Sequence, residues 1–458
     1  MWRSSTQELE AWRQRPDRKP LVIRGARQVG KSFLVEDFAA SRLDGCRTLN
    51  FERDPSLAAL FDSPDPRETV RWIELKLGAP LRPGSTLLFL DEIQAAPQVL
   101  AKLRYFAEEL PDQHVIAAGS LLDFVLEDHA FSMPVGRISY LHLEPMTFEE
   151  FLVAAGHPQL KEFLEQFDFL QTVPEPIHDQ LTELLRVYMV CGGMPAVQNA
   201  WFATHSLVEV QRVQLELLST IRDDFSKYRE AVRTDRLRRV FDALPSCVGR
   251  KVVAAEIDRE QRAGPIKEAF RMLCLARVAT AVRRSACNGV PLGAEVDPAY
   301  VKALLLDVGL YSAQAGLDAT HLKAAGDLTL VNSGQLAEQY VGQELRSARP
   351  VHREPELFCW VRAQRTSNAE VDYVIQHGNR IVPIEVKAGA TGRLRSLQVF
   401  LREKRLGLGV RICGAPPSTL DTVTALPTGG EQVPFRLLSL PLYLTGQIHR
   451  LLAAEFGE

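Results

Sequence analysis

The chain has 458 residues, of which 46% are hydrophobic and 24% charged, and its formal net charge is −3. This length is more than one hydrophobic core usually organises, so we expect roughly two to four domains. The nearly balanced charge excludes a strongly basic protein. Any contact with nucleic acid would therefore need a local basic face.

The cysteine spacing and the hydropathy of the chain indicate the cellular location that we expect. The seven cysteines are scattered, and none belongs to a C-x-x-C pair. This spacing speaks against a zinc knuckle or a disulfide framework and fits a reducing environment. The polar N-terminal stretch lacks the apolar segment of a signal peptide, and no run of about 18 apolar residues predicts a membrane span. We expect a cytoplasmic protein without membrane contact.

The first third of the chain alternates short apolar strands with helical stretches. Nearly continuous apolar strands between helices predict a parallel sheet that is covered on both faces. The expected strands are 21–24, 48–52, 87–91, 115–120 and 138–143. We expect this α/β domain to span residues 1–150.

A glycine-rich loop follows the first expected strand. Its sequence, Gly25-Ala26-Arg27-Gln28-Val29-Gly30-Lys31-Ser32, matches G-x-x-x-x-G-K-[ST] and leads into an amphipathic helix at Phe33, which is the context that this motif requires. Glycines let backbone N–H groups face phosphate oxygens, and the helix N-terminus adds positive potential. The loop from Gly25 to Phe33 therefore predicts an ATP site, with Lys31 on the β and γ phosphates and Ser32 on Mg²⁺.

Two carboxylates close the third expected strand. Asp91 and Glu92 follow the apolar run 87–90, and a strand buried on both faces rarely ends in two carboxylates without a use for them. We predict that Asp91 binds Mg²⁺ and that Glu92 is the general base for the attacking water. Ser120, at the end of the next strand, is a candidate contact to the γ-phosphate or the water. The alternatives are a helix cap at Asp91 and a plain loop serine at Ser120.

From about residue 146 the pattern changes to long helical segments, interrupted by Cys191-Gly192-Gly193-Met194-Pro195. We expect a helical lid over residues 151–245 and a winged-helix-like unit over 246–320. Four arginines are close enough to share a helix, and they predict either contacts to DNA phosphates or a solvated helical face. They are Arg233, Arg236, Arg238 and Arg239.

The last third, residues 321–458, has the pattern of an α+β unit. Asn332 or Ser333 can cap a helix that runs to about Arg346. Strands are expected over 357–361, 370–375 and 381–386, with a four-residue hairpin loop over 377–380 between the last two.

Charged side chains alternate along the two strands of this hairpin. Glu370 and Asp372 share one face, as do Glu385 and Lys387. Pairing residue 376 with residue 381 sets Asp372 opposite Glu385, and a divalent cation would remove the repulsion between them. Lys387 could then orient a water and stabilise charge on a phosphodiester. The alternative is a solvent-facing strand with a Glu370–Lys387 ion pair at the surface.

Several segments together resemble a known family. GARQVGKS, LLFLDEI, AAGS, VGRISYLHLEPMTFEEF, CGGMPAV, KALLLDVGL and EVDYVI…PIEVKAG are similar to the AAA+ ATPases that carry a C-terminal domain of unknown function numbered 4143. In AAA+ proteins an arginine of one subunit completes the neighbouring site. The resemblance therefore implies a homo-oligomer, with a hexameric ring as one form, and makes Arg137 and Arg104 the candidate arginines. An exposed structural arginine is the alternative for each.

The C-terminal pattern resembles the PD-(D/E)xK nuclease fold, in which a strand Asp and a Glu-x-Lys bind metal. Asp372, Glu385 and Lys387 match that pattern, and Glu338 in the preceding helix is the implied fourth member. Asp372 follows Glu-Val here and not a proline. The resemblance implies either an active metal-dependent nuclease or a retained fold without activity.

These patterns predict an α/β protein: a P-loop AAA+ core with a parallel sheet, a helical lid, a winged-helix-like unit and an α+β restriction-endonuclease-like domain. The expected function is an ATPase that uses ATP and Mg²⁺ and is coupled to binding or processing of DNA. Two alternatives stay open. One is an ATP-gated regulatory or defence switch with an inactive nuclease-like domain, and the other is a translocase on branched DNA that does not cleave.

Overall fold

A computed structural model describes residues 1–127, 134, 136–228, 233–317, 333–362, 369–389, 394–425 and 432–457. The chain forms two compact units, each built from three segments. The first unit contains Met1–Glu144, Leu275–Arg277 and Pro350–Glu354, and the second contains Pro145–Cys274, Val278–Arg349 and Pro355–Glu458. The domain boundary expected at residue 320 and the cap expected at Asn332 lie outside the described residues. The division into four domains stays a prediction.

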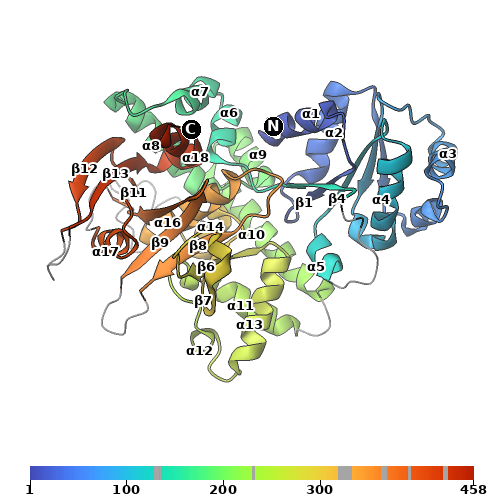
Figure 1. Cartoon of the computed structure of the whole chain (residues 1–458). Helices are drawn as coiled ribbons and strands as arrows, with labels where there is room; N and C mark the ends of the chain where they lie inside the picture. The colour runs from blue at the N-terminus through green and yellow to red at the C-terminus, as the bar shows by residue number, and fades with distance from the viewer. Residues whose placement is uncertain are drawn as a thin grey trace. The chain divides into compact units, whose positions relative to one another are not determined.

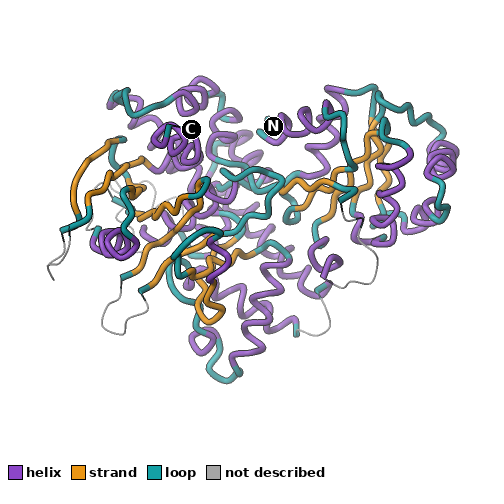
Figure 2. Tube along the Cα trace, viewed as in Figure 1, coloured by secondary structure: helices purple, strands orange, loops and turns teal. Residues whose placement is uncertain are grey.

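A five-stranded parallel sheet organises the first unit (Figures 1 and 2). Its order is β2-β3-β4-β1-β5. The strands are β1 (Leu21–Arg24), β2 (Cys46–Asn50), β3 (Leu87–Asp91), β4 (His114–Gly119) and β5 (Ser139–His142). Every residue of β3 and β4 is buried, as a central parallel strand requires. The predicted parallel α/β core is confirmed.

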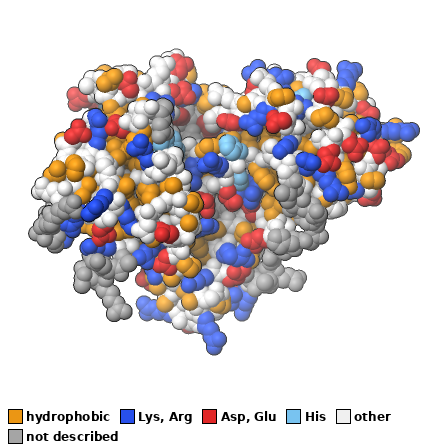
Figure 3. Space-filling view, in the orientation of Figure 1, with side chains coloured by type: hydrophobic (Ala, Val, Ile, Leu, Met, Phe, Trp, Pro, Cys, Tyr) orange, Lys and Arg blue, Asp and Glu red, His pale blue; other side chains and the backbone are white. Residues whose placement is uncertain are grey.

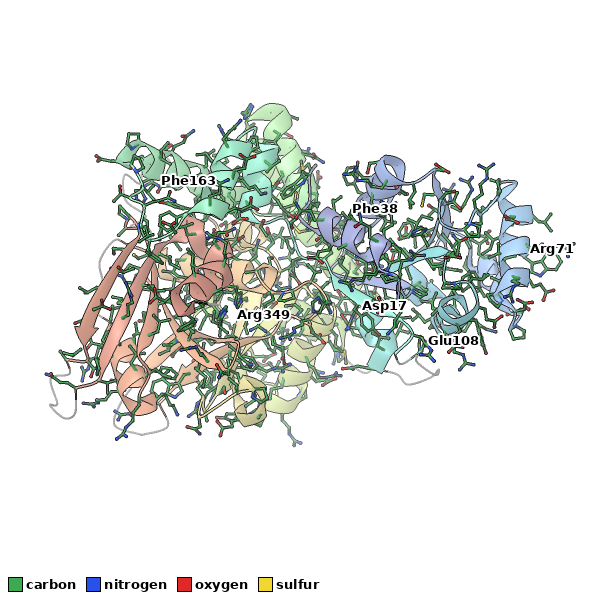
Figure 4. All side chains as sticks on the ribbon, turned by 45° about the horizontal axis from the view of Figure 1, so that its top comes forward. Asp17, Phe38, Arg71, Glu108, Phe163 and Arg349 are labelled. Carbon is green, nitrogen blue, oxygen red and sulfur yellow. The ribbon has the colours of Figure 1, made fainter. Side chains whose placement is uncertain are left out.

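Helices cover this sheet. They are α1 (Ser5–Gln14), α2 (Lys31–Arg42), α3 (Pro66–Leu77), α4 (Pro97–Glu109) and α5 (Leu122–Glu127). Leu88 and Leu90 of β3 share one apolar cluster with Leu103 of α4. Because side chains alternate along a strand, the residues between them face the other side, which α2 contacts. Phe38, labelled in Figure 4, belongs to the fully buried face of α2.

Helices form the first part of the second unit, as predicted from about residue 146, and the last two of those named next follow its first two strands. They are α6 (Phe148–Ala154), α7 (Pro158–Gln166), α8 (Glu175–Cys191), α9 (Pro195–Thr204), α10 (Leu207–Asp224), α11 (Thr234–Cys247), α12 (Ala254–Ile257), α13 (Ala263–Leu275), α14 (Val308–Gln314) and α16 (Ser333–Ser347). A capping box starts α6: the Thr147 hydroxyl accepts from the backbone of Glu150, and the Glu150 carboxylate accepts from the backbone of Thr147.

A mixed eight-stranded sheet, of order β12-β13-β11-β10-β9-β8-β6-β7, completes the second unit. Its strands are β6 (Ala279–Ser285), β7 (Val296–Leu305), β8 (Leu357–Val361), β9 (Glu370–His377), β10 (Arg380–Val386), β11 (Leu408–Cys413), β12 (Ser418–Val423) and β13 (Pro434–Pro441). Two further helices, α17 (Arg395–Lys404) and α18 (Ile448–Phe456), follow β10 and β13, and α17 packs against β9 and β10 (Figure 1). Because β6 pairs with β8, residues expected in a winged-helix-like unit join the same sheet as the C-terminal strands.

The Gly192-Gly193 interruption has a structural cause. Gly192 has a φ of 73°, and a Cβ there would lie 2.1 Å from Oδ1 of the buried Asp307. The Gly193 N–H donates to Oδ2 of Asp307 at 2.6 Å, and the Gly309 N–H donates to Oδ1 at 2.9 Å. One buried carboxylate thus joins the end of α8 to the start of α14.

No helix among the described residues has both the length and the apolar composition needed to cross a bilayer.

Candidate functional site

The glycine-rich loop connects the carboxyl end of β1 to α2. Gly30 has a φ of 93° and precedes the first residue of α2, a left-handed conformation that glycine adopts without steric cost. Lys31 is buried, and its Nζ donates to the carbonyl oxygens of Gly25 at 3.1 Å and Ala26 at 2.7 Å. Burial lowers the pKa of Lys31 to about 8, against the opposing effect of Glu92 and Asp91. Phe33, in the first turn of α2, is 52% exposed.

Ser32 and Asp91, both predicted to bind Mg²⁺, lie side by side. The Ser32 hydroxyl is 3.1 Å from Oδ1 of Asp91, and Asn50, at the end of β2, donates its amide to Oδ2 at 3.0 Å. Burial and the neighbouring Glu92 raise the pKa of Asp91. A hydroxyl and a carboxylate at one sheet edge are oxygen ligands of the kind that Mg²⁺ prefers.

Glu92 is fixed by its backbone and by two side chains. It has a φ of 51°, a left-handed conformation that is uncommon for residues other than glycine. The Gln94 amide donates to Oε2 of Glu92 at 2.5 Å, and the Ser120 hydroxyl donates to the same oxygen at 3.4 Å. Arg27 donates from Nε to the Ser120 hydroxyl at 3.2 Å. Ser120 therefore lies against Glu92, within the same cluster as the loop.

Side chains distant in sequence from the loop also bond to the loop or to the strand that precedes it. Arg3 donates to the carbonyl oxygens of Val29 at 3.0 Å and Glu144 at 2.6 Å. Asp123 accepts hydrogen bonds from Arg24 and, at 2.5 Å, from Nε of Arg277. Sequence patterns did not single out these side chains, because their partners are set by the tertiary fold. The only local signal is the position of Asp123, three residues after Ser120.

The second predicted constellation lies in the mixed sheet. Ile381 pairs with Gln376, as the predicted register requires, and the pairing continues to Ile384 opposite Tyr373, which directly precede Glu385 and follow Asp372 along their strands. The strands reach His377 and Arg380, so the hairpin loop has two residues and not the four that were predicted. The backbone N–H of Val386 donates to Oδ2 of Asp372 at 2.8 Å.

The alternative of a solvent-facing strand with a Glu370–Lys387 ion pair is wrong. Lys387 pairs instead with Glu385, with Nζ 2.6 Å from Oε1, and the Glu385 side chain is 6% exposed. Glu370 pairs with Lys302 of β7, a buried lysine that sequence analysis missed. Lys302 Nζ also lies 3.6 Å from Oε2 of Glu338 and 3.9 Å from Oδ1 of Asp372.

Four carboxyl groups and two ammonium groups therefore share one buried cluster. Burial, reinforced by the charge of Asp372, raises the pKa of Glu338 to about 8 and that of Glu385 to about 7. Within the described part of the chain, no three or more His, Cys, Asp or Glu side chains are arranged to hold a metal ion. We call Lys302, Glu338, Glu370, Asp372, Glu385 and Lys387 the carboxylate cluster.

Comparison with known proteins assigns the first unit. Residues 17–152 match the family described as an AAA domain. The N-terminal unit is a P-loop ATPase domain of the AAA type. Residues 182–321 match a domain of unknown function, DUF8612, and residues 333–426 match another, DUF4143, as the sequence resemblance predicted. No curated protein matches the sequence.

Solved structures with similarity to this chain are remote. A Walker-type ATPase of Pyrococcus abyssi shares 15% identity, with a TM-score of 0.43, 68% of this chain covered and 94% of that one. The ORC2 protein of Aeropyrum pernix, in ADPNP and ADP complexes, shares 12% identity, with a TM-score of 0.35 and coverage of 70% and 95%. The ORC1 protein of Aeropyrum pernix in complex with DNA shares 13% identity, with a TM-score of 0.27 and coverage of 69% and 93%. These scores are too low to support a functional comparison.

The two candidate trans-acting arginines of the AAA domain have partners within their own unit. Arg137 is about half exposed and pairs through Nε with Oε1 of Glu108 at 2.6 Å; Figure 4 labels Glu108. Arg104, on the same helix as Glu108, lies over the Tyr105 ring at 4.6 Å from its centroid. Val135, which precedes Arg137 by two residues, lies outside the described residues.

The four arginines of the basic segment lie at or in α11, as expected, but each has a partner in the chain. Arg233 pairs with Asp235 at 3.2 Å, Arg236 donates to Gln261 at 3.4 Å, Arg238 pairs with Asp223 at 3.8 Å, and Arg239 pairs with Asp258 at 2.6 Å. Acidic and basic side chains also intermingle on the face that Figure 3 shows. These ion pairs are typical of a solvated helical face, and contacts of the four arginines to DNA phosphates stay a prediction.

Proposed function

We propose that the AAA domain hydrolyses ATP at the loop between β1 and α2. The supporting observation is the convergence of Lys31, Ser32, Asp91 and Glu92 at the carboxyl ends of β1 and β3, held by the hydrogen bonds described above. Loop N–H groups and the N-terminus of α2 would receive the phosphates. Lys31 would exchange its bonds to the carbonyls of Gly25 and Ala26 for bonds to the β and γ phosphates.

Ser32 and Asp91 are the residues that would hold Mg²⁺, which neutralises phosphate charge when it is bound. Glu92 would take a proton from a water as the water oxygen attacks the γ-phosphorus in line, and the bond to the ADP oxygen breaks. Ser120 shares Oε2 of Glu92 with Gln94, so it would keep that carboxylate in position while the γ-phosphate binds.

Two substitutions test this proposal. Glu92→Gln keeps the shape and hydrogen-bonding capacity of the side chain but removes the base, so we expect ATP affinity near that of the wild type and a kcat lower by about 10²- to 10⁴-fold. Lys31→Ala should lose affinity as well as turnover. The measurements are nucleotide titration and phosphate release. Normal turnover in Glu92→Gln would exclude Glu92 as the base.

The expected oligomer also belongs to this proposal. Arg137 and Arg104 are exposed on the AAA domain, so either could complete the site of a neighbouring copy. An arginine that completes a neighbour's site supports turnover only in the assembly, so specific activity should rise with protein concentration. Loss of that rise in Arg137→Ala, with Lys102→Ala of α4 as a control, would identify Arg137; loss in Arg104→Ala would identify Arg104. Full turnover by a wild-type chain that sedimentation shows to be monomeric at every assayed concentration would exclude both.

For the second unit we propose an ATP-gated switch that has DNA as its partner. The basic residues of α11 and the resemblance of the sequence support DNA, although the ion pairs of α11 leave its arginines partly neutralised. Cleavage is the weaker candidate because Lys302 lies among the carboxylates that would hold a divalent cation. Translocation on branched DNA is the other candidate.

One set of measurements separates these activities. Wild type, Lys31→Ala and Lys387→Ala would be incubated with linear, forked and four-way DNA in the presence of ATP and Mg²⁺. A switch binds DNA in a nucleotide-dependent way that Lys31→Ala abolishes and Lys387→Ala retains, without cutting. Cutting that Lys387→Ala abolishes would establish a nuclease, and ATP-driven strand displacement would establish a translocase.

A further inference from the structure

The carboxylate cluster already contains a cation, the ammonium group of Lys302. The Lys302 side chain is 3% exposed, and its Nζ contacts Glu370 and lies within 3.9 Å of carboxylate oxygens of Glu338 and Asp372. Three carboxylates from α16 and β9 thus converge on one ammonium from β7. A buried lysine is costly unless it is paired, and these carboxylates provide the pairing.

Neighbouring groups keep the lysine in this position. The Tyr300 hydroxyl, two residues earlier on β7, donates to Oε2 of Glu370 at 3.3 Å. Gly249 lies so close to Glu338 that a Cβ there would be 2.9 Å from its Oε1. The pairing of Lys302 with Val282 anchors its backbone in the sheet. Lys302 is therefore a built-in part of the cluster and not a surface side chain that has folded over it.

A divalent cation would have to compete with this ammonium. Mg²⁺ binds carboxylate oxygens at about 2.0–2.1 Å in near-octahedral geometry. Two cations in the same small, poorly solvated space repel each other strongly, because the low local dielectric does not screen them. The second lysine, Lys387, pairs with Glu385, with Nζ 2.6 Å from Oε1. A further carboxylate oxygen is therefore already bonded to an ammonium group.

We infer that Lys302 occupies the place in the carboxylate cluster that a divalent metal would take in a nuclease, so that the cluster is an internal ion network that holds α16, β7 and β9 together. The donor set does not fit a metal-dependent nuclease. This inference concerns the second unit only, and it is independent of ATP hydrolysis by the AAA domain.

Mn²⁺ binding to the full-length, nucleotide-free chain tests the inference. All variants would carry Asp91→Asn, which removes the carboxylate among the predicted metal ligands of the AAA domain. Bound Mn²⁺ would be measured by electron paramagnetic resonance in this parent, in the parent with Asp372→Asn, and in the parent with Lys302→Ala. Lys251→Ala is the matched control, because Lys251 bridges to the backbone of Lys302 but has an exposed side chain.

We expect the parent and its Asp372→Asn variant to bind Mn²⁺ equally weakly, and Lys302→Ala to gain at least about tenfold in affinity, which is the effect of about 1.4 kcal/mol. Lys251→Ala should match the parent. Tight Mn²⁺ binding by the parent that Asp372→Asn abolishes would overturn the inference. So would a folded Lys302→Ala variant with no gain in affinity. If Lys302→Ala does not fold, the comparison of the parent with Asp372→Asn still decides.

Discussion

At the scale of single residues, neighbouring side chains hold the two carboxylates of the proposed ATP site. Gln94 and Ser120 both donate to Oε2 of Glu92, while Asn50 donates to Asp91. Glu92 occupies an uncommon backbone conformation, which the surrounding bonds maintain. If Glu92 is the base, as proposed, Gln94 is a positioning residue that acts through Glu92 and not on the substrate.

Removal of this support should affect turnover more than binding. We expect Gln94→Ala to lower kcat by roughly tenfold while KM for ATP stays near the wild-type value, since a misplaced base costs transition-state stabilisation only. Steady-state phosphate release measures both constants. Gln98→Ala, an exposed glutamine four residues later, is the control. A change in KM alone would contradict a positioning role.

Lys31 predicts how ATP affinity depends on pH. Burial lowers the pKa of Lys31 to about 8 in the free protein. Phosphates favour the charged form, so ATP binding above this pH must take up a proton. Affinity should be constant below pH 8 and fall above it, by up to about tenfold per pH unit. Nucleotide titrations from pH 7 to about 9.5 measure this. Lys31→Arg should abolish this fall in affinity with pH, because arginine stays protonated. An equal fall in that variant would show that another group causes the pH dependence.

At the scale of helices and strands, a buried carboxyl group links α6, α8 and α16. Glu344 accepts from the Phe148 N–H at 3.2 Å, and the Tyr188 hydroxyl lies 3.5 Å from the same oxygen. Burial, with Glu149 nearby, raises the pKa of Glu344 to about 8. The folded chain therefore keeps this carboxyl protonated at pH values where the unfolded chain has ionised it.

The sign of the pH effect follows from this shift. Stability from Glu344 is fully present below the unfolded pKa and is lost as pH rises towards about 8, at up to about 1.4 kcal/mol per pH unit. Glu344→Gln cannot ionise, so it should match the wild type at low pH and exceed it at pH 8 by roughly 1–3 kcal/mol in the free energy of unfolding. Urea denaturation at both pH values measures the difference. Glu183→Gln, at an exposed site on α8, is the control. A pH-independent difference would refute the shift.

Local patterns predicted the elements whose own residues carry the signal, either a continuous apolar run or an alternation of apolar and polar side chains. Strands 21–24 and 87–91 have the expected bounds, and the hairpin has the expected register. Period-two alternation was enough to set Asp372 beside Glu385. Lys302 was missed because it precedes Asp372 by 70 residues and meets it only through the folded sheet. The edge strand β12 was missed because all but one of its residues are exposed, so it has no apolar alternation.

At the scale of the whole molecule, the AAA domain is not one continuous stretch of chain. The first unit ends its main segment at Glu144, yet it also contains Leu275–Arg277 and Pro350–Glu354. Arg277 donates to Asp123, and Val351 accepts from the backbone N–H of His142 at the edge of β5. Composition and motifs did not predict that these two short segments belong to the first unit, because each contains only three to five residues.

A shortened protein tests their importance. Residues 1–152 contain every motif of the ATP site but lack Arg277 and Val351, so Asp123 loses a buried guanidinium and β5 loses an edge partner. We expect the fragment to unfold at a lower denaturant concentration than the first unit of the full chain, with a deficit of about 2–4 kcal/mol from the lost charged and backbone hydrogen bonds. Tryptophan fluorescence of Trp12 against urea, with the other tryptophans replaced by Phe, follows this unit in both proteins. Equal urea midpoints of unfolding for the two proteins would show that the two short segments do not stabilise the first unit.

These interleaved segments have a consequence for how the chain is made. A ribosome releases the P-loop, both acidic residues of β3 and the whole parallel sheet long before it reaches Arg277 or Val351. Among the described residues, Asp123 is paired with Arg24 alone until Arg277 has been made, more than one hundred residues after Glu144, and β5 gains the contact to Val351 only after more than two hundred. During that interval the first unit lacks the hydrogen bonds that Arg277 and Val351 make in the finished chain, so the order of synthesis leaves its own stability lowest before those residues emerge.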